Sequence, residues 1–271
     1  DDSIALILSS CVPSDRAALG LEVMRAGKDY LCDKAAFLNF EDLEAARAVQ
    51  AETGRIFAIS YSERLLERSA ERAGELVRSG VIGRIVQVAI LAPHTLRIGG
   101  RPSWFFERKH YGGILTDIGS HQIEQFLYYS GVTHAEVASS LVANYKHPNY
   151  GEFEDYGEAT FRGWDADGNA CTGFVRVDWL IPDSAAHTGR HRVIVGTEGI
   201  LELGGDTLTL VNGSGTERID CSTDPVLFGP RLVDDVLHRT ETAIGQEHCF
   251  FTSELTLKAQ TAALKTGNLT P

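Results

Sequence analysis

Two short stretches of the 271-residue chain carry side chains suited to acid–base chemistry. One is Asp33-Lys34, and the other, residues 112–121, reads Gly-Gly-Ile-Leu-Thr-Asp-Ile-Gly-Ser-His. Asp117 and His121 are four residues apart, so a helix places both side chains on one face. A histidine that titrates near neutrality is a natural general base for a hydroxyl proton, and a nearby carboxylate can fix its tautomer. Lys34 can donate to a substrate oxygen and stabilise negative charge that develops there.

Each of these residues also has a purely structural interpretation. Lys34 alone would be a solvated lysine in a turn, and Asp117 with His121 would be a helix-start carboxylate near a surface histidine. A metal site would need a third ligand, such as His94 or Glu124. No spacing in the sequence requires such a ligand, so we expect no metal.

The elements around Asp33 and Lys34 must place them at a ligand site. An apolar strand over 4–8, a polar turn over 9–15 and a helix over 16–26 come first, with Asp15 as the expected N-cap. Strands over 30–32 and 55–60, and a helix over 40–53 capped by Asn39, complete a βαβαβ order. This order predicts a parallel sheet, which binds ligands at the carboxyl ends of its strands.

The first strand has no predicted neighbour on one side. No Gly-x-Gly-x-x-Gly opens a strand–helix unit in this sequence. An apolar strand over 4–8 would form a sticky edge if nothing paired with it. We therefore expect that an N-terminal segment precedes these residues, or that another chain covers the edge.

After residue 61 the regular alternation of predicted strands and helices ends. Helices are predicted over 63–79, 114–130, 230–246 and 252–265, and a loop rich in Gly, Arg and aromatic residues over 93–113. Strands are predicted over 83–91, 136–145, 156–164, 172–180, 191–196, 200–203, 207–211 and 217–220. Clustered strands predict a large open, mostly antiparallel sheet backed by helices, so the fold class is α/β plus α+β.

The composition of the chain disfavours several classes of partner and site. With 25 Lys and Arg against 37 Asp and Glu, the net charge of −12 disfavours nucleic acid and anionic membranes as partners. No run of about 18 apolar residues predicts a membrane span, and Asp1-Asp2-Ser3 does not open a signal peptide. The five cysteines form no Cys-x-x-Cys pair, so a disulfide framework and a zinc knuckle are not expected. The expected setting is a reducing cytoplasm.

Several motifs, taken in order, are similar to those of one enzyme family. They are Ser10-Cys11-Val12-Pro13, Arg25-Ala26-Gly27-Lys28, Leu31-Cys32-Asp33-Lys34-Ala35, residues 78–83, Trp104, residues 112–121 and residues 195–199. The chain thereby resembles the glucose–fructose oxidoreductase, inositol dehydrogenase and MocA (Gfo/Idh/MocA) family over nearly its whole length. The resemblance implies the C-terminal half of a Rossmann domain in residues 1–61. It also implies a substrate-binding and oligomerisation domain in residues 62–271.

The resemblance also implies an activity. Members use NAD or NADP and move hydride between the nicotinamide and a hydroxyl-bearing carbon of a sugar, cyclitol or related polyol. Lys34 would contact the substrate hydroxyl and the cofactor ribose, while His121 takes the hydroxyl proton with help from Asp117. The cofactor residues would be Ser10, Pro13, Asp33, Lys34 and Trp104. The substrate residues would be Lys34, His94, Arg97, Asp117 and His121, with Arg101 in the covering loop.

The sequence departs from the family pattern at several positions. Asp33 replaces the usual Glu, and Ala35 replaces a Pro that would restrain Lys34. Glu124 stands where Asp is common. Without the glycine fingerprint the cofactor pyrophosphate has no cradle. Two alternatives therefore stay open, a catalytically silent sensor of a dinucleotide or sugar, and a lyase or epimerase that retains its cofactor.

Assembly is the last expectation. Val175, Val177 and Trp179 alternate with polar residues in a predicted strand. We expect them on a sheet face that a second subunit covers, giving a homodimer or homotetramer.

Overall fold

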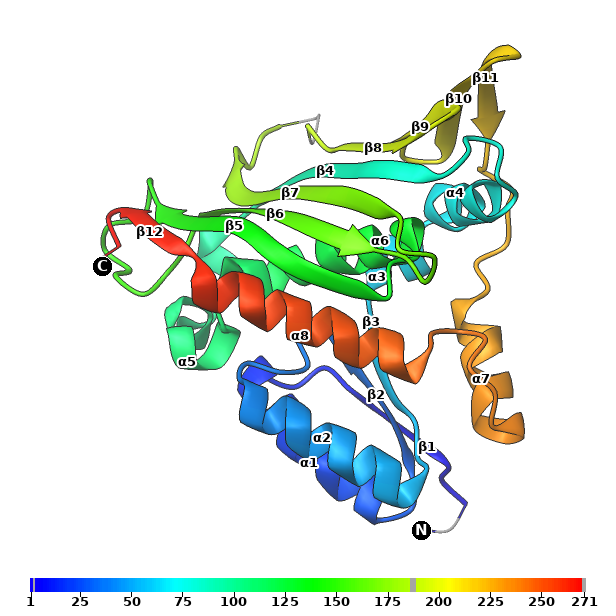
Figure 1. Cartoon of the computed structure of the whole chain (residues 1–271). Coiled ribbons are helices and arrows are strands. Elements are labelled where there is room, and N and C mark those ends of the chain that lie inside the picture. The colour runs from blue at the N-terminus through cyan, green and yellow to red at the C-terminus, as the bar shows by residue number, and fades with distance from the viewer. Residues whose placement is uncertain (2, 186–188, 270–271) are drawn as a thin grey trace.

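Two β-sheets of different size form the layers of the molecule in the computed structural model, which describes residues 1, 3–185 and 189–269 (Figure 1). The small sheet has the order β1-β2-β3, and the large one the order β11-β10-β9-β8-β4-β7-β6-β5-β12. The fold class predicted from the sequence is confirmed.

The small sheet is parallel throughout. Its elements are β1 (Leu6–Ser9), α1 (Pro13–Arg25), β2 (Asp29–Asp33), α2 (Phe40–Thr53) and β3 (Phe57–Ser60). Helix α2 has the predicted bounds, because the Asn39 side chain accepts a hydrogen bond from the Asp42 amide and Gly54 ends the helix with a positive φ. Helix α1 starts earlier than predicted, with Pro13 at its first position. Asp15 is therefore not the N-cap, and it lies in the first turn instead.

The large sheet is mixed but mostly antiparallel. Its strands are β4 (Ile85–Thr95), β5 (His134–Asn144), β6 (Tyr156–Trp164), β7 (Ala170–Ile181), β8 (His191–Gly196), β9 (Gly199–Gly204), β10 (Thr207–Asn212), β11 (Gly215–Asp220) and β12 (Leu264–Gly267). Two pairs in the sheet, β4 with β7 and β5 with β12, are parallel. The eight strands predicted from the sequence are all present, and β12 was not expected.

The helices beyond the small sheet differ more from the prediction. They are α3 (Ser62–Leu65), α4 (Arg68–Arg78), α5 (Arg108–Tyr111), α6 (Ser120–Ser130), α7 (Phe228–His238) and α8 (Gln246–Ala262), with 3-10 turns at Ile98–Gly100 and Ser103–Phe106 and a π-helical segment at Leu115–Gly119. The helix predicted over 63–79 is broken at residues 66 and 67. The one predicted over 230–246 stops at His238. The Asp235 carboxylate accepts bonds from Thr240, Thr242 and Ala243, which fold the next residues into a loop.

One face of the large sheet packs on α6. Val175, Val177 and Trp179 point to this face, with at most 4% of each residue exposed. The expectation that they lie on an uncovered face is therefore wrong, because alternation along a strand does not show which side the helices cover. The opposite face carries Thr172, Phe174 and Arg176.

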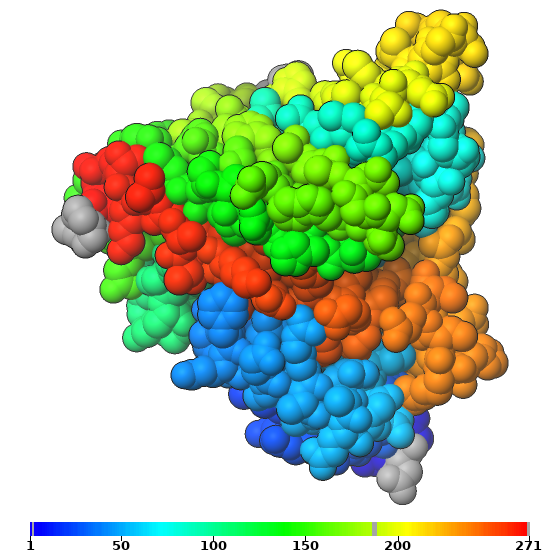
Figure 2. Space-filling model, in the orientation of Figure 1, coloured from blue at the N-terminus to red at the C-terminus, as the bar shows by residue number. Residues whose placement is uncertain are grey.

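Helix α8 lies between the two sheets and contacts both (Figures 1 and 2). At its start, the Gln246 amide accepts from the Phe57 N–H and donates to the Phe57 carbonyl on β3, both at 2.8 Å. Near its end, Gln260 Oε1 accepts from the Leu115 N–H at 2.9 Å. The core of the small sheet also includes Phe228 and Phe250, from α7 and α8.

No helix within the part of the chain that the structure describes is long and apolar enough to cross a membrane. The five cysteines are unpaired.

Candidate active site

Lys34 and Asp117 meet although 83 positions separate them in the sequence. Lys34 follows β2 at the carboxyl edge of the small sheet, and Asp117 lies in the π-helical segment under the large sheet. Lys34 Nζ is 2.5 Å from Asp117 Oδ1, and the two side chains are only 13% and 10% exposed. The fold thus places a shielded ion pair where the two sheets approach each other.

Arg16 fixes the turn that carries Lys34. Its side chain is buried in the first turn of α1. Nε donates to the Cys11 carbonyl at 2.9 Å, and Nη1 donates to the carbonyls of Asp33, Lys34 and Ala35. These bonds join the loop after β1 to the loop after β2, so the alanine at position 35 does not leave the Lys34 backbone unheld. The Lys34–Ala35 peptide bond is cis.

Arg16 was not among the residues predicted for the site. A signal was available, because Arg16 falls on the same helical face as the buried Gly20 and Val23. An arginine at such a core-facing position needs buried acceptors.

Asp117 and His121 do not form the hydrogen-bonded pair that a plain helix suggested. The chain passes through a π-helical turn before α6, which changes the offset between successive side chains. The Asp117 carboxylate binds Lys34, and the His121 ring packs edge-on against Tyr61. Within the described residues, Asp117 Oδ2 and His121 Nδ1 are buried and have no hydrogen-bond partner. Buried polar atoms in proteins normally have partners, so these two are available to a bound ligand.

Burial also sets the charge of His121. The ring is fully enclosed, and this lowers the pKa of His121 to about 4, with a further lowering from Lys34 and an opposing effect of Glu63. The imidazole is therefore neutral at pH 7, which is the form that accepts a proton.

Glu63 organises a polar cluster beside His121. Its Oε1 lies 2.9 Å from His94 Nε2 and 3.0 Å from Arg190 Nη2, while Oε2 accepts from Gln122 Nε2 at 2.6 Å. Burial alone would raise the pKa of Glu63, but the charge of His121, the bond from His94 and the charge of Arg190 hold it well below its usual range. His94 was a predicted substrate residue, whereas Glu63, which binds it, was not predicted.

The remaining predicted residues fall into two groups. Ser10, Pro13 and Asp33 lie in the loops that follow β1 and β2, near Lys34 in the chain, and Asp33 faces Arg16 at 3.7 Å. Trp104 and Arg97 belong to the loop after β4, where Trp104 packs against Phe105 and Arg97 is exposed.

Glu124 binds Arg64 and His248 behind the site. Its Oε1 accepts from Arg64 Nε at 2.6 Å and lies 2.9 Å from His248 Nε2. The carboxylate is therefore already occupied by two basic side chains, one from α3 and one from α8.

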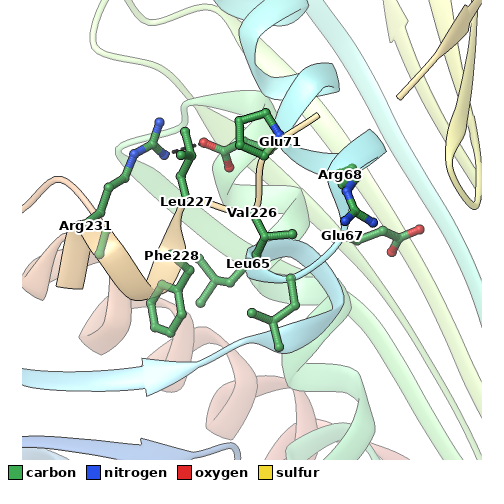
Figure 3. Close-up of a pocket in the computed structure, with 11 residues that line it drawn as sticks. Leu65, Glu67, Arg68, Glu71, Val226, Leu227, Phe228 and Arg231 are labelled. Atoms are coloured by element: carbon green, nitrogen blue, oxygen red, sulfur yellow. Dashed lines mark hydrogen bonds and ion pairs between the residues drawn. The ribbon is translucent and has the colours of Figure 1, made fainter. Parts of the chain in front are cut away.

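A small cavity lies between α3, α4 and the start of α7 (Figure 3). Its volume is about 10 Å³, and its walls include Leu65, Glu71, Phe228 and Arg231. None of the predicted site residues lines it, and it has room for a single water at most.

Comparison with known proteins identifies the family. The family model described as the GFO/IDH/MocA C-terminal domain matches residues 70–202. The chain is 43% identical to a candidate oxidoreductase of known structure from Erwinia carotovora atroseptica, with a TM-score of 0.93, over 98% of this chain and 82% of that one. A curated relative from Schizosaccharomyces pombe, described as an uncharacterized oxidoreductase, is 26% identical over 157 residues. That alignment spans 58% of this chain and 42% of the relative.

More distant structures share the fold. An aldose–aldose oxidoreductase from Caulobacter crescentus, complexed with glycerol, is 20% identical with a TM-score of 0.78, over 96% of this chain and 78% of that one. A levoglucosan dehydrogenase in complex with NADH is 18% identical with a TM-score of 0.69, over 98% of this chain and 73% of that one. The fold, the ordered motifs and these matches agree: the chain belongs to the Gfo/Idh/MocA family of oxidoreductases.

Proposed function

We propose that the protein moves hydride between NAD or NADP and a hydroxyl-bearing carbon of a sugar, cyclitol or related polyol. The observation that carries the proposal is the shielded Lys34–Asp117 pair. Asp117 and His121, in one motif, each also have a buried polar atom without a hydrogen-bond partner among the described residues. Neighbours of the same fold that were solved with NADH or with glycerol support this substrate and cofactor class.

The residues at the carboxyl edge of the small sheet fit the nicotinamide end of such a cofactor. Ser10, Pro13 and Asp33 lie in loops that Arg16 joins, with Lys34 beside them. We also assign Trp104, on the loop after β4, to this side. When bound, the nicotinamide supplies the hydride acceptor or donor. The sequence holds no glycine fingerprint at a strand–helix turn, so this assignment covers only the nicotinamide and its ribose.

The protein side chains then handle the proton and the charge. In oxidation, the hydroxyl O–H bond breaks and its proton passes to the neutral His121, while the C–H bond electrons leave as hydride. The Lys34 ammonium, held by Asp117, donates to the substrate oxygen and stabilises its developing negative charge. In reduction the same groups act in reverse, and His121 returns the proton.

We also propose the setting of the enzyme. The five cysteines are unpaired, and burial raises the pKa of the Cys32 and Cys249 thiols, so they behave as apolar core residues. This favours a reducing cytoplasm. We place a homodimer or homotetramer contact on the uncovered face of the large sheet, and a domain boundary at residues 61 and 62.

Two lysines at opposite ends of β2 provide the test. Lys34 follows the strand and Lys28 precedes it, with no ion pair to Lys28 within the described chain. The experiment measures the intact mass, then NADH and NADPH titration, then oxidation of a polyol panel. We expect one dinucleotide to bind and a polyol to be oxidised, K34M to lower kcat by about 10²-fold or more, and K28M to change it less than twofold.

Three results would contradict the proposal. These are that neither dinucleotide binds, that no polyol reduces either cofactor, or that K34M and K28M have the same kcat. Binding without net cofactor turnover would favour the sensor or the lyase and epimerase alternatives.

A further inference from the structure

We propose that the polyol substrate carries an anionic group, a carboxylate or a phosphate, and that Arg101 binds this group beside the Lys34–Asp117 pair. This inference rests on the proposed function and names the substrate class of the same site.

Arg101 is a half-buried cation held by aromatic rings. Its guanidinium carbon lies 4.3 Å from the Phe105 ring centroid and 5.0 Å from that of Trp179, and its Nε donates to the Leu96 carbonyl at 3.0 Å. Burial lowers the pKa of Arg101, and Asp117 is the carboxylate whose charge opposes this effect. The Asp117 carboxylate is itself already bound to Lys34.

The buried arginines of the structure show what Arg101 lacks. Arg16, Arg64 and Arg192 are each less than 10% exposed, and each pairs with a carboxylate, from Asp33, Glu124 and Glu67 respectively. No described carboxylate forms an ion pair with Arg101. A partly desolvated guanidinium without a counter-ion is costly, and an anionic ligand would offset that cost.

Trp179, which packs against Arg101, connects it to the polar cluster around Glu63. The Trp179 ring lies edge-on to His94, with centroids 5.5 Å apart, and His94 binds Glu63. The indole Nε1 of Trp179 is buried, and none of the described residues accepts a hydrogen bond from it. Arg101 has no ion-pair partner and the Trp179 indole N–H has no acceptor among the described residues, so both suit the oxygens of a carboxylate or phosphate.

A cavity of about 310 Å³ borders Trp179 and adds positive charge. Its walls are mainly apolar, and its charged members are Arg97, Lys146 and Asp183. Neither Arg97 nor Lys146 forms an ion pair with another described residue, so with Arg101 the region holds three cations against one free carboxylate. The whole chain has a net charge of −12, so this local excess of positive charge is opposite in sign to the charge of the molecule. It favours the binding of an anionic ligand.

Paired probes test the proposal without relying on turnover. Isothermal titration of the full chain, with and without saturating NADH or NADPH, compares gluconate with sorbitol and glucose 6-phosphate with glucose. We expect at least one anionic member to bind tenfold or more tightly than its neutral partner, with the difference shrinking as salt rises from 50 to 500 mM. Preference in the first pair alone identifies a carboxylate, in the second alone a phosphate, and in both a general anion site.

Substitutions locate the preference. R101Q removes the preference while leaving neutral-probe affinity within twofold, and R101K retains part of it because the charge persists. R25Q is the matched control, because it removes the same positive charge as R101Q from an exposed arginine in the last turn of α1. Thermal melting of each variant checks that it is folded.

Two outcomes would overturn the inference: equal affinity for the anionic and neutral members of both pairs, or an R101Q variant that is folded and keeps the preference. The two proposals can fail separately. Turnover of neutral polyols by a chain that shows no anion preference, or one that R101Q does not remove, would refute the anion site alone. An Arg101-dependent anion preference without any hydride transfer would refute the dehydrogenase activity alone.

Discussion

His121 combines two properties that usually exclude each other in a histidine. It is almost fully buried, yet its Nδ1 has no partner among the described residues. Burial disfavours the charged imidazolium, which explains the low pKa of about 4. The side chain is thus held as a proton acceptor through the neutral pH range, while the Lys34 side chain binds Asp117.

The neutral state of His121 predicts a pH profile for polyol oxidation. Below its pKa, His121 is protonated and cannot take the hydroxyl proton, so kcat/KM should be flat from pH 7 to about 5 and fall near pH 4. H121N should lower kcat by about 10²–10⁴-fold at pH 7 and remove the acid limb. Initial rates from pH 4 to 8 test this, with H134N as control because His134 is exposed at the start of β5. A limb near pH 6.5 would show that the imidazole is not desolvated.

Part of the site was predictable at the residue scale. Lys34 stands out because it directly follows a short apolar strand, and Asp117 and His121 stand out because they fall inside an apolar, glycine-rich stretch. The pairing of Lys34 with Asp117 was not predictable, because it depends on how two sheets are oriented. Glu63 and Arg16 were missed because single acidic or basic residues in helices usually face solvent.

At the scale of elements, the turn after β2 depends on one side chain from α1. Four backbone carbonyls, at positions 11, 33, 34 and 35, accept bonds from Arg16. The helix and both strand ends therefore move together, and Lys34 is positioned by a residue that is placed at no reacting atom.

R16M should release this turn. Buried carbonyls would lose their donor, so the free energy of unfolding should fall by about 1–3 kcal/mol. Because Lys34 would lose its fixed position, kcat should fall more than the affinity for polyol changes, and R16K should recover only part of the loss. Urea unfolding and steady-state kinetics measure both effects, with R25M at the other end of α1 as control. Full activity in a folded R16M would refute the positioning role.

Local signals explain where element prediction succeeded. Asn39 and Gly54 mark both ends of α2, and a turn over residues 165–169 joins the predicted strands β6 and β7. The prediction failed where contacts that a periodic pattern does not show decide the structure. The Asp235 carboxylate binds the residues after α7 and folds them into a loop, and β12 pairs with β5, which is distant in the sequence.

At the scale of the whole molecule, the uncovered face of the large sheet is the surface on which we propose self-association. Ala89 is in register with Phe174 on one side and with Val193 on the other, so a partly buried apolar band crosses three strands there. Apolar bands of this kind are commonly covered in oligomers.

F174E should therefore weaken assembly. Light scattering at micromolar concentration should give a dimer or tetramer for the natural chain and a smaller species for F174E, because a buried unpaired charge opposes the contact. T216E, on the exposed strand β11, is the control. A natural chain that is already monomeric would contradict the assembly.

The two hydrogen bonds between Gln246 and Phe57 protect one edge of the small sheet from pairing with another chain. In the small sheet β3 has β2 on one side only, and its other side would present backbone groups to any passing strand. The side-chain amide of Gln246 imitates a neighbouring strand, because it satisfies both the N–H and the carbonyl of Phe57. Through Gln246 alone, helix α8 therefore occupies backbone groups at the β3 edge of the small sheet and opposes edge-to-edge aggregation there.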